Sequence, residues 1–462
     1  MKNKDHKLRT LKKESYREEI INGPITSTLM KLAWPIMITN GMQVLYNIAD
    51  TFWVGKISAQ AVAAISISFP VVFLFISIGA GINISGTTLV AQYTGAGESE
   101  NADKVATQLF VFIFSLSVIL SFIGYLFNEN ILHLIGAPEN IMDQATGYLN
   151  IFFIGLPFMF LFFVFSALLR GVGDTKTPMK MMIISVLINI VADPFIIFGW
   201  SFFPELGVRG AALATISSRA IAGLFGMYLL FSGKKGIHIK KKYLKPDLKM
   251  YKKILRIGIP SAGEKSMAAI SIVLFMGIIS RFGTMAVAAY GIGHRVMSIV
   301  RMPVRGFGRG TTTMVGQNLG ADKIDRAERC TWIATAITFI SLILIWIGVF
   351  IFSEQIIAIF NNNPEVVKIG SSFLKIAGFS FSFIGIRLVI GSGFRGAGNT
   401  LIAMILAIIA LIILRIPLSY FLSVNLNWGI NGVWWGMLIA NAISAIIGII
   451  WFQKGTWKEK EV

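Results

Sequence analysis

Long runs of apolar residues recur along the whole chain and alternate with short polar segments. A transmembrane α-helix needs about 20 predominantly apolar residues to cross a bilayer, and each run is at least that long or nearly so. The pattern therefore predicts an all-α, polytopic membrane protein with twelve transmembrane helices. We place these spans at residues 27–54, 61–91, 104–127, 142–169, 177–199, 210–232, 252–280, 286–317, 327–352, 366–392, 400–424 and 432–453.

An internal repeat relates the first half of the chain to the second. Pro35 and Pro260 lie 225 residues apart, and the pattern Arg-Gly-x-Gly-x-Thr at residues 170–175 recurs at the same spacing at residues 395–400. Since the spacing holds without a gap from the first span to the sixth, we predict two parallel six-helix lobes with pseudo-two-fold symmetry. Two such lobes with a cleft between them are typical of an alternating-access transporter.

The polar segments between the spans predict the orientation and the domains. Lys and Arg are concentrated in alternate connections, and this asymmetry predicts that both termini are cytoplasmic in a multi-pass protein of the plasma membrane. The predicted domains are a basic cytoplasmic arm at 1–24, an N-terminal lobe at 25–232, a Lys-rich cytoplasmic linker at 233–251, a C-terminal lobe at 252–453 and a cytoplasmic tail at 454–462.

Composition excludes several other classes of protein. The chain is 55% hydrophobic and only 14% charged, whereas soluble domains carry about 25% charged residues. The net charge of +19 follows the connections between spans, so we interpret it as a topology signal and expect no nucleic-acid partner. The glycine-rich segment 170–175 follows a membrane span rather than a strand, and no Walker loop is present, so we expect neither ATP drive nor enzymatic activity.

The first span carries a polar face that ends in a carboxylate. Gln43, Tyr46, Asn47 and Asp50 are spaced i, i+3, i+4 and i+7, so they share one side of a helix. A carboxylate inside a bilayer is costly and by default marks a functional site. We therefore regard Asp50 as the centre of a candidate site and the other three side chains as possible lining of a polar cavity.

The fifth span offers a partner for this carboxylate. Asn189 and Asp193 are one turn apart and Pro194 follows directly. A proline removes a backbone donor and frees carbonyl groups in the preceding turn, near Ile190. Two carboxylates close together in a medium of low dielectric repel each other, and either a bound sodium ion or a proton would relieve that repulsion. The residues leave the choice between the two cations open.

The repeat provides an internal control for this hypothesis. The positions that correspond to Asp50, Asn189 and Asp193 in the second half are Phe275, Leu414 and Leu418. If the polar groups only supported the fold, we would expect some of them to recur. Their absence from the second copy favours a function confined to the first lobe, and the alternative is a buried hydrogen-bonded pair that fixes helix packing.

The second lobe carries intramembrane charges of its own. Glu264 lies in the seventh span, and His294, Arg295, Arg301 and Arg305 lie in the eighth. Further arginines follow at Arg309, Arg387 and Arg415. Three interpretations stay open: the arginines pair with Glu264 and with helix ends, they line the cleft and favour anionic or zwitterionic substrates, or they form a row near the inner headgroups.

Several segments together make the chain similar to the multidrug and toxic compound extrusion (MATE) transporters. They are LYNIADTFWVG in the first span, LVAQYTGAG and MVGQNLGA at the ends of the second and eighth, RGVGDTKTPM after the fourth, NIVADP in the fifth and RGAGNT after the tenth. The resemblance covers residues 25–453. It implies export of small organic compounds driven by inward flow of sodium ions or protons, with no cofactor besides the coupling ion.

The resemblance also implies roles for individual residues. It places ion coupling, including a sodium site, at Asp50, Asn189 and Asp193, with Thr215 as a further oxygen donor. Tyr148 matches a polar position of the same lobe. The row of arginines departs from the family pattern, so a flippase or exporter of a lipid-linked or anionic precursor is the alternative. We expect a monomer whose partners are its substrate and membrane lipid.

Overall fold

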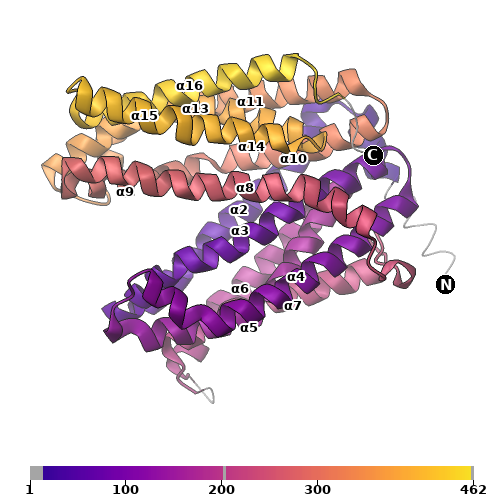
Figure 1. Ribbon diagram of the computed structural model, residues 1–462, viewed down its shortest axis with the longest axis horizontal. Helices are drawn as coiled ribbons and strands as arrows, with labels where there is room; N and C mark the ends of the chain where they lie inside the picture. The colour runs from indigo at the N-terminus through magenta and orange to yellow at the C-terminus, as the bar shows by residue number, and fades with distance from the viewer. Residues whose placement is uncertain (1–13, 201–203, 459–462) are drawn as a thin grey trace. The chain divides into compact units, whose positions relative to one another are not determined.

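A computed structural model of the chain describes residues 14–200 and 204–458, and this part is built of helices and short connections without a strand. Residues 14–22 are helical. The long helices of the first half are α2 (Ile25–Gly55), α3 (Ala59–Gly95), α4 (Ser99–Leu134), α5 (Glu139–Val172), α6 (Lys176–Phe198) and α7 (Gly207–Phe231). The second half contains α8 (Leu248–Ile279), α9 (Thr284–Val300), α10 (Met302–Gly320), α11 (Ile324–Ile351), α12 (Ser353–Ala358), α13 (Pro364–Gly396), α14 (Thr400–Ile408), α15 (Arg415–Tyr420) and α16 (Gly429–Gln453) (Figure 1).

The all-α fold is confirmed, and most predicted spans coincide with one helix to within a few residues. Two spans are interrupted. The span at 286–317 breaks at Arg301 into α9 and α10, and Pro303 lies in the first turn of α10, where its missing N–H costs nothing. The span at 400–424 contains π-helical segments at Ile409–Leu414 and Phe421–Asn425. Pro417 lies between these segments and cannot donate to the carbonyl group four residues earlier.

Ten helices of the described chain are long and apolar enough to cross a membrane. The helix α2 is not among them, because asparagine, glutamine and aspartate lower the hydropathy of its second half. The α9–α10 pair is also not among them, because of its break and its arginines. Both of these spans carry candidate charged groups: Asp50 in α2, and Arg295, Arg301 and Arg305 in or between α9 and α10.

Large apolar side chains cover the outside of the helices. Phe122 is 65% exposed, Val191 62%, Val273 72% and Leu344 64%. In water such an apolar surface would drive aggregation, whereas in a bilayer the lipid tails solvate it. The exposed side chains thus agree with a protein whose helices are surrounded by lipid.

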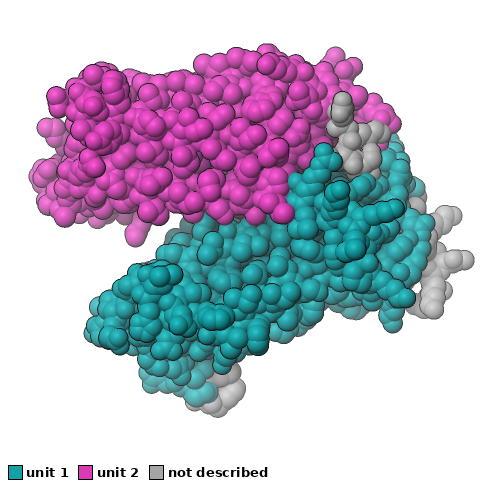
Figure 2. Space-filling view, in the orientation of Figure 1, with its two compact units in different colours: residues 1–18, 38–258 teal, residues 19–37, 259–462 magenta. Residues whose placement is uncertain are grey.

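The chain forms two compact units (Figure 2). Of the described residues, the first unit contains 14–18 and 38–258, and the second contains 19–37 and 259–458. The start of α2 thus belongs to the second unit, because its Leu29, Leu32 and Ala33 are buried in a cluster of that unit. The predicted N-terminal lobe, residues 25–232, instead follows the sequence repeat. That division of the chain stays a prediction.

The helix α5 forms the centre of the first unit. Its phenylalanines Phe153, Phe160 and Phe165 are fully buried. The helix α7 approaches it closely at Gly223, where a Cβ atom would lie 2.8 Å from the carbonyl oxygen of Phe158. This close approach lets α7 and α5 pack backbone to backbone and holds α7 in place for the polar site described below.

Substituting Gly223→Ala is expected to lower stability by roughly 1–3 kcal/mol, because the added methyl group would meet backbone that cannot move aside. The matched control is Gly348→Ala in α11, where nothing lies within 4 Å of the added atom. Alanine is the better helix former, so the control should be neutral or slightly stabilising. Thermal unfolding in detergent measures both, and equal midpoints would contradict the close contact.

Hydrogen bonds and ion pairs hold the segment after α7 against α4 of the same unit. Asp103 accepts a hydrogen bond from the backbone N–H of His238 and forms an ion pair with Lys240 at 2.8 Å. Lys104 forms an ion pair with Asp247 at 2.7 Å, and its hydrogen bond is the main reason why the pKa of Asp247 is lowered. The Lys-rich segment predicted as a linker is therefore held in a defined conformation.

The described parts of the chain ends also pack. Arg17 donates to the backbone carbonyls of Thr94 and Gly95 at 3.0 and 2.9 Å. In the tail, Trp457 stacks on Phe452 with 4.6 Å between ring centroids. The remainder of the predicted basic arm, residues 1–13, and the end of the predicted tail, residues 459–462, lie outside the described residues.

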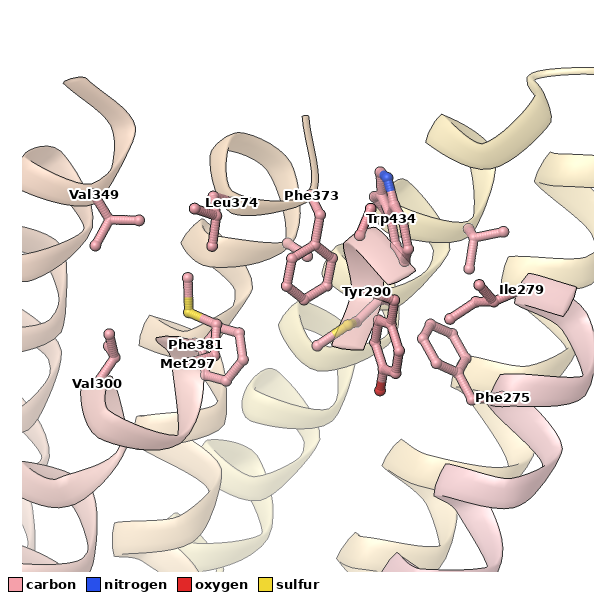
Figure 3. Packing of buried hydrophobic residues seen from close by; sticks show 14 of the residues in the cluster. Phe275, Ile279, Tyr290, Met297, Val300, Val349, Phe373, Leu374, Phe381 and Trp434 are labelled. Atoms are coloured by element: carbon pink, nitrogen blue, oxygen red, sulfur yellow. The ribbon is translucent and has the colours of Figure 1, made fainter. Parts of the chain in front are cut away.

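The core of the second unit contains a cluster of aromatic residues (Figure 3). The rings of Tyr290 and Trp434 stack with 6.0 Å between centroids. Phe275 and Phe373 meet Tyr290 edge to face at 5.7 and 5.5 Å. Such pairs add about 0.5–1.5 kcal/mol each to the burial of their surface. They fix Phe275 at the position that corresponds to Asp50 of the first unit.

Candidate functional site

The polar face of α2 lies against α7 within the first unit. The hydroxyl group of Tyr46 donates to the backbone carbonyl of Thr215 at 3.0 Å and lies 2.8 Å from the hydroxyl group of Ser218. Tyr46 is only 1% exposed. These bonds fix the rotation of α2, so that Asp50, one turn further along, points toward the same helix.

Asp50, Asn189, Asp193 and Thr215 come together from three helices. The side-chain amide of Asn189 donates to Oδ1 of Asp193 at 2.9 Å, and both residues are fully buried in α6. Asp50 of α2 is in contact with both of them. The hydroxyl group of Thr215 in α7 donates to Oδ2 of Asp50 at 3.3 Å. The structure thus assembles all four residues that were predicted for ion coupling.

Three oxygen atoms of this group have no hydrogen-bond partner among the described residues. They are Oδ1 of Asp50, Oδ1 of Asn189 and Oδ2 of Asp193. A buried polar atom without a partner is costly, and each of these atoms can only accept a hydrogen bond or a cation unless its carboxyl group is protonated. Carboxylate, amide and hydroxyl oxygens suit a hard monovalent cation, and a carboxylate suits a proton equally well.

Arg219 is a part of this site that the sequence interpretation missed. It is 7% exposed on α7, donates to the side-chain oxygen of Gln43 at 2.6 Å and lies 4.9 Å from the ring centroid of Tyr46. Asp50 is within its electrostatic range. An arginine in the middle of an apolar span was the signal that could have revealed it.

The other predicted residues of the first unit lie around this centre. Asn47 is exposed and accepts a hydrogen bond from the amide group of Gln43 at 3.2 Å. Tyr148 of α5 packs against an apolar cluster that includes Val54 and Ile197. Gln43 therefore touches both Asn47 and Arg219, whereas Tyr148 lines the apolar side of the group.

In the second unit, Glu264 of α8 pairs with Arg395 rather than with the arginines of the eighth span. Its two oxygens accept from Nη1 of Arg395 at 3.1 and 2.8 Å, and both side chains are largely buried. Arg395, at the end of α13, also donates to Ser392 at 2.8 Å. In the sequence this arginine begins the second copy of the Arg-Gly-x-Gly-x-Thr pattern, at residues 395–400.

The charged residues of the eighth span separate into two groups. Arg301 lies at the break between α9 and α10, where its Nη2 is 3.2 Å from Nε2 of His294. Because a guanidinium can only donate, Nε2 accepts and the ring proton of His294 lies on Nδ1. Arg295 and Arg305 are exposed. Among the described residues, no group of three or more His, Cys, Asp or Glu side chains is arranged to hold a metal ion.

Comparisons with known proteins agree with this architecture. The family model MatE matches residues 35–195 and again residues 260–421, which reproduces the internal repeat. A probable multidrug resistance protein of Bacillus subtilis, YoeA, is 32% identical over 93% of both chains. A protein of Shewanella oneidensis named FAD transporter is 26% identical over 93% of this chain and 94% of its own.

The solved structures give the same result. The crystal structure of a MATE protein in complex with MaL6 matches with a TM-score of 0.89 and 25% identity, covering 95% of this chain and 97% of its own. The arrangement of twelve helices in two lobes agrees with this match, and the family consists of membrane transporters rather than enzymes. Since the MatE model covers well over half of the chain, the protein belongs to the MatE family of multidrug efflux transporters.

Proposed function

We propose that the protein is a cation-coupled antiporter that exports organic compounds by alternating access. The observation that carries the proposal is the group of unpartnered oxygens of Asp50, Asn189 and Asp193 in the first unit. They are contributed by two helices, lie next to the hydroxyl group of Thr215, and have apolar counterparts in the second half of the repeat. Either sodium or a proton would satisfy them.

The charges of the site support a stoichiometry of one cation. When Asp50 and Asp193 are both ionised, the guanidinium of Arg219 balances one of them. One negative charge then remains, and a single sodium ion or proton neutralises it. A buried charge without a counterion is strongly disfavoured. The site is therefore expected to take up and release one monovalent cation in each cycle.

The course of α2 suggests how binding reaches the rest of the molecule. Asp50 lies in the part of α2 that belongs to the first unit, whereas residues 19–37 belong to the second. Pro35 lies within the helix close to this division, and prolines are common sites of helix bending. A cation that draws Asp50 toward α6 would change the direction or bend of α2, and substrate would leave in response.

The remaining expectations complete the proposal. The asymmetry of Lys and Arg predicts that both termini lie in the cytoplasm and that the protein lies in the plasma membrane, so the cation is expected to enter from outside as the substrate leaves. We expect a monomer in contact with lipid. The alternative function is export or flipping of an anionic precursor, which is favoured by the arginines of the second unit and by the relative that is named an FAD transporter.

Transport in proteoliposomes tests the coupling. Purified protein is reconstituted, and uptake of ethidium and of FAD is measured under an imposed sodium gradient at equal pH and, separately, under a pH gradient without sodium. We expect one of the two gradients to accelerate transport at least tenfold over protein-free vesicles, and an ionophore for that ion to abolish the effect. Transport that is insensitive to both gradients would contradict the proposal.

A further inference from the structure

The intramembrane arginines of the second unit have no counterpart in the first. The corresponding positions of the repeat are all apolar, which removes a shared role in holding the six-helix scaffold together. The residues Arg301, Arg305, Arg309, Arg387 and Arg415 correspond to Ile76, Ala80, Ile84, Phe162 and Ile190. Arg387 and Arg415 are buried, and buried cations within a membrane span are costly and by default mark a function.

Arg415 is held in a geometry that suits anion binding. Its guanidinium carbon lies 3.6 Å from the ring centroid of Phe275, and the side chain is 7% exposed. Tyr290 contacts the guanidinium and packs between Phe275 and Trp434 (Figure 3). Stacking on an aromatic face leaves the in-plane N–H groups of an arginine available to a carboxylate or phosphate, and Nε has no partner among the described residues.

Two further arginines and a histidine lie within electrostatic range of Arg415. Arg387 is 6% exposed, and its Nε likewise has no partner among the described residues. Arg387, Arg301 and His294 each interact electrostatically with Arg415. His294 and Arg301 are half-buried, so they lie nearer to the surface of the unit, with Arg415 and Arg387 further inside.

The nearby carboxylate does not neutralise this group. Glu264 is within range of Arg387, but both of its oxygens accept from Arg395. Glu264 and Arg395 therefore balance each other, and the charges of Arg301, Arg387 and Arg415 remain. Arg387 and Arg415 are buried and each has an Nε donor without a partner among the described residues, so this group of cations lacks an anion.

The backbone before Arg415 is locally widened. The π-helical segment Ile409–Leu414 ends directly at this residue, and Ser271 of α8 donates to the carbonyl of Leu411 in that segment at 2.8 Å. The π-helical turns found in proteins are frequently located at functional sites. In this chain the widened turn determines where the side chain of Arg415 projects from the helix.

We infer that Arg415 and Arg387, with Arg301 and His294 toward the surface, form a binding site for the carboxylate or phosphate group of an organic anion. This inference rests on the proposed export function, because it names the class of compound that the second unit binds. The two halves of the repeat then carry opposite chemistry at corresponding places: carboxylates for a cation in the first, and a stacked arginine for an anion in the second.

Binding of FMN and riboflavin tests the site directly, because the two molecules share one ring system and only FMN carries a phosphate. The purified protein is placed in nanodiscs of phosphatidylcholine, and flavin fluorescence is titrated without any ion gradient. We expect FMN to bind at least tenfold more tightly than riboflavin. Equal affinity of the two flavins would overturn the inference, whatever the outcome with the variants.

Variants test which residues contribute to the affinity for FMN. Arg415→Met is expected to weaken FMN binding at least tenfold and to leave riboflavin unchanged. The matched control Lys368→Met removes one positive charge from an exposed position of α13 and should bind FMN normally. If Arg415→Met does not fold, Arg387→Met takes its place. A folded Arg415→Met protein with unchanged FMN affinity would overturn the assignment.

Two further arms separate the sources of the phosphate and the two proposals. Replacing a third of the lipid with phosphatidylglycerol should leave FMN affinity within twofold; strong competition would mean that a lipid headgroup occupies the site and would overturn a soluble anion as the ligand. FMN binding without gradient-driven transport would contradict the proposed ion coupling and support the anion site. Gradient-driven transport without FMN binding would contradict the anion site and support the ion coupling.

Discussion

Asp50→Asn is expected to lower gradient-driven transport at least a hundredfold while the protein still folds and inserts. Asparagine keeps the shape of the side chain and its hydrogen bond from Thr215, but it cannot be ionised. The site then contains one carboxylate, Asp193, against the guanidinium of Arg219, so that no net negative charge remains to attract a cation. Without the cation, the cycle of uptake and release has no driving force.

The measurement is the initial rate of uptake in proteoliposomes under whichever gradient drives the wild type. Asp143→Asn is the matched control, because this carboxylate of the same unit is 88% exposed and pairs with Arg209 at the surface. It should transport normally. A normal rate in Asp50→Asn at equal protein content would refute ion coupling at this residue. Downhill equilibration of substrate by Asp50→Asn would, in contrast, agree with a carrier that has lost only its coupling.

Glu264→Leu is expected to destabilise the protein by about 3–5 kcal/mol. The substitution leaves Arg395 largely buried without its carboxylate, and removing one partner of a buried ion pair usually costs this much. The double variant Glu264→Leu/Arg395→Leu should recover most of the loss, because neither charge is then buried alone. This result would show that Glu264 stabilises the fold and is not one of the residues that bind substrate.

Thermal unfolding of the purified variants in detergent measures this effect. The control is Glu354→Gln, which removes the carboxylate of an exposed pair with Lys375 and should change stability by less than about 1 kcal/mol. Similar midpoints for Glu264→Leu and Glu354→Gln would show that the Glu264–Arg395 pair contributes little. A double variant as unstable as the single one would show that Arg395 is not the reason for the loss.

The course of the helices could be predicted well from the sequence, because the length of an apolar run and its polar boundaries determine where a helix crosses a bilayer. The break at Arg301 and the π-helical turns around Arg415 could not. They depend on how prolines and arginines are accommodated by neighbouring helices, such as the hydrogen bond from Ser271 to Leu411. Periodicity within one span contains no information about such contacts.

The candidate site was predicted in part. Asp50, Asn189, Asp193 and Thr215 could be assembled from helical spacing and family resemblance, and the structure brings them together. Arg219 was not predicted, because its partners Gln43 and Tyr46 lie on another helix and no spacing within its own span connects them. The partner of Glu264 was also missed, since Arg395 is 131 residues away and nothing local in the sequence connects them.

The assignment of residues 19–37 to the second unit has a consequence for how the duplicated chain can be divided. A single cut in the segment 233–251 separates the two sequence repeats but not the two folded units, because Leu29, Leu32 and Ala33 would stay with the wrong fragment. Each fragment would then expose apolar surface that the other one covers. The two copies are related by sequence, but the second copy lacks residues 19–37 of its folded unit, so it is not a complete unit without the first.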